Sequence, residues 1–115
     1  MIYEPYELDG VTVGSSELSI VSGSTSLQTI TTDGVYQLWI DAYAMAKGDE
    51  FRVKAYEKVE ATGGTKKVFA QWTLLGAQTE IFVTPSFVLM HGWDFTITKI
   101  AGSDRAFDAS IRRLA

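Results

Sequence analysis

The chain has 115 residues, of which 46% are hydrophobic, enough for a single domain with its own core. It contains no cysteine, which excludes disulfides, thiol catalysis and cysteine-ligated zinc. Its formal net charge of −4 is the opposite of what a nucleic-acid-binding surface requires. We therefore expect no nucleic-acid partner. No run has the length of a membrane span or the apolar centre of a signal peptide, so no membrane partner is expected either.

Residues 1–9 are predicted to form an extended arm, followed by a single β-sandwich domain over residues 10–115. The apolar side chains of the arm have no clean period, and its proline biases the preceding residue toward extended backbone. Such a segment must lie against an apolar surface of its own domain or of a partner. The arm residues predicted to bind a partner are Ile2, Tyr3, Pro5 and Tyr6.

Short strands are predicted next over residues 10–13, 17–22 and 27–31. The pair Asp33-Gly34 that follows is a strong turn signal. Serine, threonine and glycine are frequent throughout this stretch, so the last of the three strands is expected to be weak.

The segment VYQLWIDAY, residues 35–43, is the clearest strand. Alternate residues from Tyr36 onward are apolar and are expected to face the core. Trp39 lies on the opposite face, together with Gln37 and Asp41. It is therefore predicted to be either a ligand platform or an interface residue.

Two strands, 50–59 and 66–75, are predicted to form a hairpin that turns at Gly63-Gly64. In the first strand apolar side chains alternate with charged ones, which is typical of an antiparallel strand with one face in water. Glycine adopts the positive φ that tight hairpin turns require. The second strand carries Trp72 on its apolar face, so this side chain is expected in the core.

The remaining strands are predicted over residues 80–84, 86–90, 92–100 and 105–114. Pro85 separates the first two and predicts an edge, a bend or a change of sheet. The whole chain thus contains about eight short strands separated by turn residues. We predict an all-β fold, an antiparallel β-sandwich with jelly-roll or Greek-key connectivity.

No catalytic constellation is recognisable in the sequence. His91 is the single histidine, and a metal site or a base paired with Asp94 is less well supported than an ordinary loop residue. The adjacent acids Asp49 and Glu50 point to opposite faces of a strand and make a poor catalytic pair. The other acids have basic neighbours and are interpreted as surface charges. No enzyme activity, cofactor or metal is therefore predicted.

The aromatic residues suggest a carbohydrate-binding surface as one hypothesis, because sugar rings stack on exposed aromatic faces. Trp72 and Trp93 lie on the apolar faces of their strands and are expected in the core instead. Trp39 is the exception, since its strand face is partly polar.

Several strand-and-turn pieces, RVKAYEKV, the TP before an apolar run, GWDFTITKIAGSDR and the ending SIRRL, resemble small structural proteins from tailed-phage virion gene clusters. The resemblance covers roughly residues 34–114 and contains no catalytic signature. It leaves residues 1–33 without an assigned role.

The resemblance implies a head decoration or cement protein that binds the major capsid protein and stabilises the assembled capsid. Such a protein would be made in the host cytoplasm and located on the capsid surface, as a homo-oligomer for which the class suggests a trimer. Trp39, Arg112 and Arg113 are the secondary contact candidates. Two alternatives remain: a carbohydrate-binding β-sandwich module, and a tail or connector component.

Overall fold

The computed structural model describes all residues 1–115 and contains nine β-strands and no helix. It accordingly has no helical segment with the length and hydropathy of a membrane span. The strands are β1 (Tyr3–Val13), β2 (Leu18–Ser19), β3 (Gly34–Asp41), β4 (Glu50–Glu57), β5 (Lys67–Leu75), β6 (Phe82–Val83), β7 (Phe87–Leu89), β8 (Asp94–Ala101) and β9 (Arg105–Arg113).

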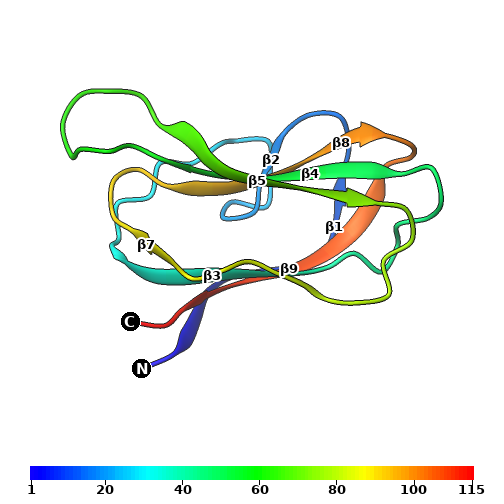
Figure 1. The fold of residues 1–115 in the computed structure, drawn as a ribbon, viewed down its shortest axis with the longest axis horizontal. Coiled ribbons are helices and arrows are strands. Elements are labelled where there is room, and N and C mark those ends of the chain that lie inside the picture. Colours follow the sequence, from blue (N-terminus) through cyan, green and yellow to red (C-terminus); the bar gives the residue numbers. More distant parts are fainter.

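The strands form two antiparallel sheets that face each other (Figure 1). The five-stranded sheet has the order β1-β9-β3-β6, with β7 also pairing with β3, and the four-stranded sheet has the order β2-β8-β4-β5. If β6 and β7 are counted as one interrupted strand, this is the strand order of an eight-stranded jelly roll. The predicted β-sandwich is confirmed, and its connectivity is the jelly roll.

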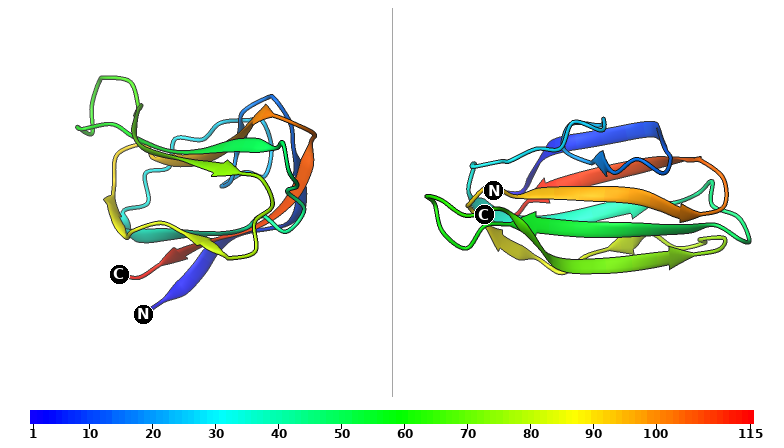
Figure 2. Two further views of the ribbon diagram at one scale, coloured as in Figure 1. Left: turned by 45° about the vertical axis from the view of Figure 1, so that its right-hand side comes forward. Right: turned by 90° about the horizontal axis from the view of Figure 1, so that it is seen from above.

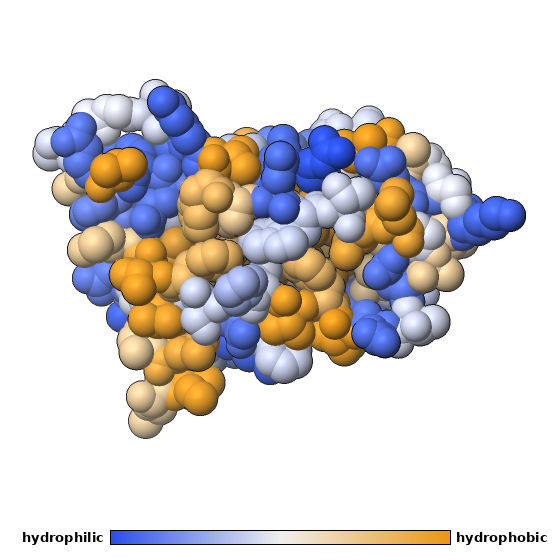
Figure 3. All heavy atoms as spheres, viewed as in Figure 1, coloured by the Kyte–Doolittle hydropathy of each residue, from blue (hydrophilic) through white to orange (hydrophobic).

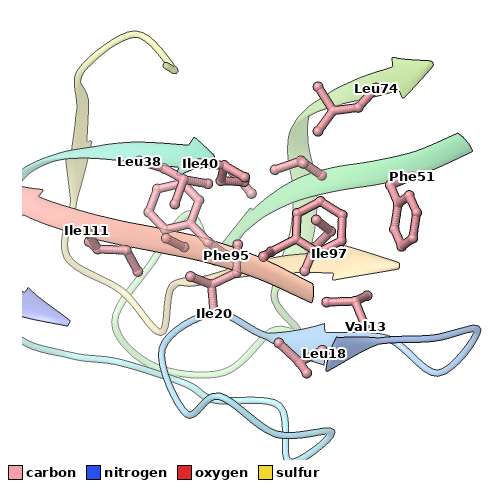
Figure 4. Packing of buried hydrophobic residues seen from close by; sticks show 14 of the residues in the cluster. Val13, Leu18, Ile20, Leu38, Ile40, Phe51, Leu74, Phe95, Ile97 and Ile111 are labelled. Atoms are coloured by element: carbon pink, nitrogen blue, oxygen red, sulfur yellow. The ribbon is translucent and has the colours of Figure 1, made fainter. Parts of the chain in front are cut away.

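The core lies between the two sheets and contains 19 buried hydrophobic residues. Figure 4 shows Leu38, Ile40 and Ile111 of the five-stranded sheet beside Phe95 and Ile97 of the four-stranded sheet. From Val35 to the end of β3 half-buried and buried residues alternate, as predicted from the sequence. This alternation fixes which side chains of each strand remain on the outer face.

The predicted hairpin is confirmed as β4 and β5, which pair from Glu50 with Leu75 to Glu57 with Lys67. Gly63 at its turn has a φ of 71°, in the left-handed region that glycine adopts without strain. The break predicted at the second proline is also present, because β6 and β7 flank it and both pair with β3.

Residues 3–9 form the first part of β1, which pairs with β9, so that only two residues precede the sheet. The register shifts between Tyr3 and Tyr6, where Pro5 interrupts the pairing of this edge strand. Tyr6 then faces the core and packs edge-on against Trp93, with 6.1 Å between the ring centroids. From Tyr3 onward the predicted arm thus contacts its own domain, while Met1 and Ile2 project from it.

The strand predicted over residues 27–31 is wrong, because only Ile30 forms an isolated bridge, to Trp93. Serine side chains in the preceding loop bond to neighbouring backbone groups instead; the hydroxyl of Ser22, for example, donates to the carbonyl of Ser26 over 2.9 Å. Such local hydrogen bonds compete with a β-ladder.

The interpretation of Asp94 as a surface charge is also wrong, since Asp94 is only 1% exposed. Its carboxylate accepts hydrogen bonds from the hydroxyl of Ser19 over 2.8 Å and from the backbone N–H of Gln28 over 2.9 Å. The ammonium of Lys66 lies 3.8 Å away. Burial raises the pKa of Asp94, and these partners partly offset that effect.

Candidate binding face on the five-stranded sheet

The outer surface of the five-stranded sheet carries an open groove of about 610 Å³. This volume lies within the range of small-ligand sites in proteins. Strands β1, β9 and β3 form its floor, and the loop before β6 contributes one wall through Ile81. The groove holds five carboxylates and one guanidinium, contributed by Glu4, Glu7, Asp9, Asp41, Asp108 and Arg112.

The side chains of the groove are exposed because of the alternation along each strand. Since Leu38 and Ile40 face the core, Trp39 and Asp41 on β3 must face outward. The same alternation places three residues of β9 on this face: Asp108, Ser110 and Arg112.

Trp39 is held in a fixed position on this face. Its indole N–H donates to the side-chain carbonyl of Gln37 over 3.0 Å. The guanidinium of Arg112 lies 4.0 Å from the ring centroid, a cation–π contact, and its Nε donates to the hydroxyl of Ser110 over 3.2 Å. The half-buried indole is therefore preorganised before any ligand arrives.

Two carboxylates on β1 interact directly. Glu4 accepts a hydrogen bond from the hydroxyl of Ser110, which lowers the pKa of Glu4, and a hydrogen bond with Glu7 lowers it further. The same hydrogen bond raises the pKa of Glu7. The pair shares a proton more readily than two isolated carboxyl groups would.

Asp41 on β3 stands directly opposite Asp108 on β9 in the strand register. Like charges in this arrangement destabilise a sheet. Asp108 is partly compensated, because it accepts the backbone N–H of Gly10 over 2.8 Å. An unfavourable pairing of this kind is expected where the charges serve a ligand.

Only part of the predicted contact set lies in this groove. Tyr3 is 45% exposed and accepts a hydrogen bond from Arg113 over 2.8 Å, at the end of the sheet where both termini lie. Ile2 projects from the fold, while Pro5 and Tyr6 are half-buried in β1. The predicted residues that do line the groove are Trp39 and Arg112.

Sequence analysis placed Asp41 on the face of Trp39 but did not predict that the carboxylates of the groove lie together. A period of two from the core positions identifies Asp41 and Asp108 as outward-facing residues. That period does not show that their strands are neighbours, so the convergence of the acids is visible only in the fold.

His91 lies in the turn before β8, where its carbonyl accepts the backbone N–H of Lys58 over 2.9 Å. The structure contains no group of three or more histidine, cysteine, aspartate or glutamate side chains placed to hold a metal ion.

Comparison with known proteins finds similarity in overall shape alone. No family model and no curated protein matches the sequence. The Eiger TNF of S. frugiperda superimposes with a TM-score of 0.45 at 18% identity over 79% of this chain. The CBM22-1–GH10 modules of Clostridium thermocellum xylanase 10B, complexed with xylohexaose, superimpose with a TM-score of 0.45 at 14% sequence identity over 74% of this chain. A xylan-binding domain from CBM 22 superimposes with a TM-score of 0.44 at 10% sequence identity over 86% of this chain.

This chain spans 66%, 17% and 64% of those three chains, in the same order.

Proposed function

We propose that this protein is a carbohydrate-binding module that holds a glycan in the groove of the five-stranded sheet. The proposal rests on one observation: the half-exposed indole of Trp39 is held in place by Arg112 and lies among carboxylates in an open groove on the outer face of the sheet. A sugar has weakly polar C–H faces and a rim of hydroxyl groups. The face offers a partner for each.

The face of the Trp39 indole that Arg112 does not cover supplies an apolar surface for the C–H face of a sugar ring. The carboxylates around it accept hydrogen bonds from sugar hydroxyls, and bonds to ionised acceptors are stronger than neutral ones. Arg112 adds donors beside the ring, in a position already fixed by Ser110. Because the groove is open, a chain of several sugar units can lie along it.

The charge of the groove selects among glycans. Five carboxylates face a single guanidinium, so the local potential is negative. Uronic acids and sulfated sugars would be repelled. We therefore propose a neutral glycan or one that contains amino sugars as the ligand.

The close interaction of Glu4 with Glu7 favours binding over hydrolysis for this pair of carboxylates. Catalytic carboxyl groups of glycosidases stand about 5–9.5 Å apart, so that the sugar or a water fits between them. Glu4 and Glu7 are instead hydrogen-bonded to each other.

Replacing Trp39 with alanine is expected to weaken glycan binding by ~30-fold or more, since truncating an aromatic anchor costs about 2 kcal/mol or more. Titration calorimetry with cellohexaose, xylohexaose and a chitosan oligosaccharide measures the effect. Tyr43→Ala is the matched control, because Tyr43 is 52% exposed and does not line the groove.

Polygalacturonate serves as the acidic comparison and is expected not to bind. The proposal is wrong if none of the three oligosaccharides binds the wild-type protein. It is equally wrong if Trp39→Ala and Tyr43→Ala bind a ligand as tightly as the wild type.

A capsid decoration protein is the second candidate function, and the two residues before β1 favour it. Met1 and Ile2 are 102% and 70% exposed, an apolar tip suited to insertion between capsid subunits. Deleting Met1 and Ile2 removes no strand residue, so the fold is expected to persist.

The test of this second function is co-sedimentation with phage shells that lack the protein. Wild-type protein is expected to pellet with the shells, and the two-residue deletion to bind ~10-fold or more weakly, as loss of buried apolar side chains predicts. Absence of co-sedimentation at every salt concentration would exclude the major capsid protein as the partner.

A further inference from the structure

Strand β5 forms one edge of the four-stranded sheet and pairs only with β4. On its other side the carbonyl of Leu75 accepts a hydrogen bond from the side chain of Gln78 over 2.8 Å, and the strand forms no backbone hydrogen bond to another strand there. An edge strand of this kind is a template for pairing with another strand. In Figure 2, seen from above, β5 runs along one side of the molecule and β1 along the other.

The other edges of the two sheets are protected. Strand β1 carries Pro5, two register shifts and the acids Glu4 and Glu7. Strands β6 and β7 have two and three residues and are separated by Pro85, and β2 has two residues. Charges, prolines, irregularities and short length are the devices that prevent strands from pairing between molecules.

Strand β5 has almost none of these devices. It is nine residues long and contains no proline and no acid. Its single charged residue is Lys67, at its first position. Its one irregularity in pairing lies near that same end, between Val68 and Ala70. Residues 70–75 therefore offer a regular, uncharged edge.

The side of the sandwich next to this edge is apolar. Phe69 on β5 is 46% exposed, and its ring lies 5.1 Å from that of Phe87 on β7. Figure 3 looks onto this side and shows several patches of hydrophobic residues separated by more polar ones. Beneath them, the ring of Trp72 packs against that of Phe82 with 5.6 Å between centroids, which gives the surface a rigid base.

We propose that two copies of this chain form a dimer in which β5 pairs antiparallel with β5 of the other copy. An antiparallel pair of identical strands is self-complementary about a two-fold axis. With the axis at Thr73, Trp72 stands opposite Leu74 of the partner subunit, and Gln71 stands opposite Leu75 of the partner subunit. No like charges meet, although each copy carries a net charge of −4.

The available surface is large enough for a stable dimer. This side of the molecule measures 42 by 31 Å, since it is viewed down the 20 Å axis in Figure 3. A standard interface covers about 800 Å² on each partner. Phe69 lies on β5 itself and would be buried together with the strand edges.

The dimer places both grooves on the same side of the assembly. A two-fold axis through paired edge strands runs perpendicular to their sheet, so the two five-stranded sheets turn their outer faces in one direction. Two binding faces presented together raise the avidity for a repetitive target, such as a polymer or a lattice. The arrangement is two-fold and differs from the trimer that the phage resemblance suggests.

The experiment is analytical ultracentrifugation of the full chain over a concentration series, comparing the wild type with Thr73→Lys. Thr73 is exposed and lies on the proposed axis, so the substitution sets two ammonium groups against each other. We expect a wild-type dimer and a dissociation constant raised ~10-fold or more in the variant. Thr12→Lys is the matched control, because Thr12 is an exposed threonine on the opposite edge.

Gln71→Lys provides a second substitution on the same exposed face of β5, and unchanged melting curves establish that both variants fold. A wild-type protein that remains monomeric at every concentration overturns the proposal. So does a dimer that Thr73→Lys and Gln71→Lys both leave intact, or one that Thr12→Lys dissociates. Glycan affinity in the single groove is measured separately and does not enter this result.

Discussion

Replacing Asp49 with alanine is expected to lower the melting temperature by ~5 °C or more, the size typical for loss of a buried hydrogen-bond network. Asp49 is only 3% exposed and accepts three hydrogen bonds. The donors are the N–H of Ala46 at 2.9 Å, the N–H of Ser103 at 3.1 Å and Nε of Arg105 at 2.7 Å. The carboxylate thereby joins the loop before β4 to the turn between β8 and β9.

The same contacts give this stability a pH dependence. The hydrogen bond from Ala46, followed by that from Arg105, lowers the pKa of Asp49 from 3.8 to about 2. A carboxyl group with a lower pKa in the folded state contributes stability above its unfolded pKa of 3.8. This contribution is lost as the pH falls from 3.8 toward about 2.

Thermal melts at pH 7 and at a series of acid pH values measure both effects. Asp49→Asn is expected to be less stable than the wild type at pH 7, and the difference should narrow as the pH falls. Asp104→Asn is the control, because the carboxylate of Asp104 is 58% exposed and forms only a surface ion pair with Lys99. Equal melting temperatures for Asp49→Asn and Asp104→Asn would show that the network does not stabilise the fold.

The fold was predictable from sequence where the signal is local. The strict alternation of VYQLWID predicts β3, and two glycines between alternating strands predict the β4–β5 hairpin. The pairing of β1 with β9 could not be predicted, since it joins residues about a hundred positions apart, such as Gly10 and Asp108. Hydrophobic periodicity predicts which face of a strand is buried, but it does not predict which other strand pairs with it.

The candidate site depends on that long-range pairing. Trp39 and Arg112 were identified as contact residues, but their stacking requires β3 and β9 to be adjacent. The burial of Asp94 was missed for a similar reason, because the serine-rich loop that covers it has no hydrophobic period. Polar loops that fold onto a sheet leave little trace in a pattern of apolar residues.

Trp93→Ala is expected to cost about 3–5 kcal/mol of unfolding free energy, the range for removing a large aromatic side chain from a core. The side chain is fully buried, and its ring centroid lies 4.4 Å from that of Tyr36 and 5.8 Å from that of Phe95. Its indole N–H donates to the carbonyl of Thr32 over 3.1 Å, which ties the long loop to the core. A loss of this size approaches the whole stability of a small domain.

Trp72→Ala is the matched comparison, because the sequence places both tryptophans on apolar strand faces. Trp72 lies on the edge strand β5 and is only half-buried, so less of its surface returns to water when it is truncated. Urea unfolding followed by circular dichroism should therefore show a clearly smaller loss for Trp72→Ala than for Trp93→Ala. Equal losses would mean that the side of the sandwich at β5 is as enclosed as its centre. In the proposed dimer Trp72 is enclosed only at protein concentrations where β5 is paired with its partner. The loss of unfolding free energy caused by Trp72→Ala should therefore grow with protein concentration, whereas the loss caused by Trp93→Ala should not.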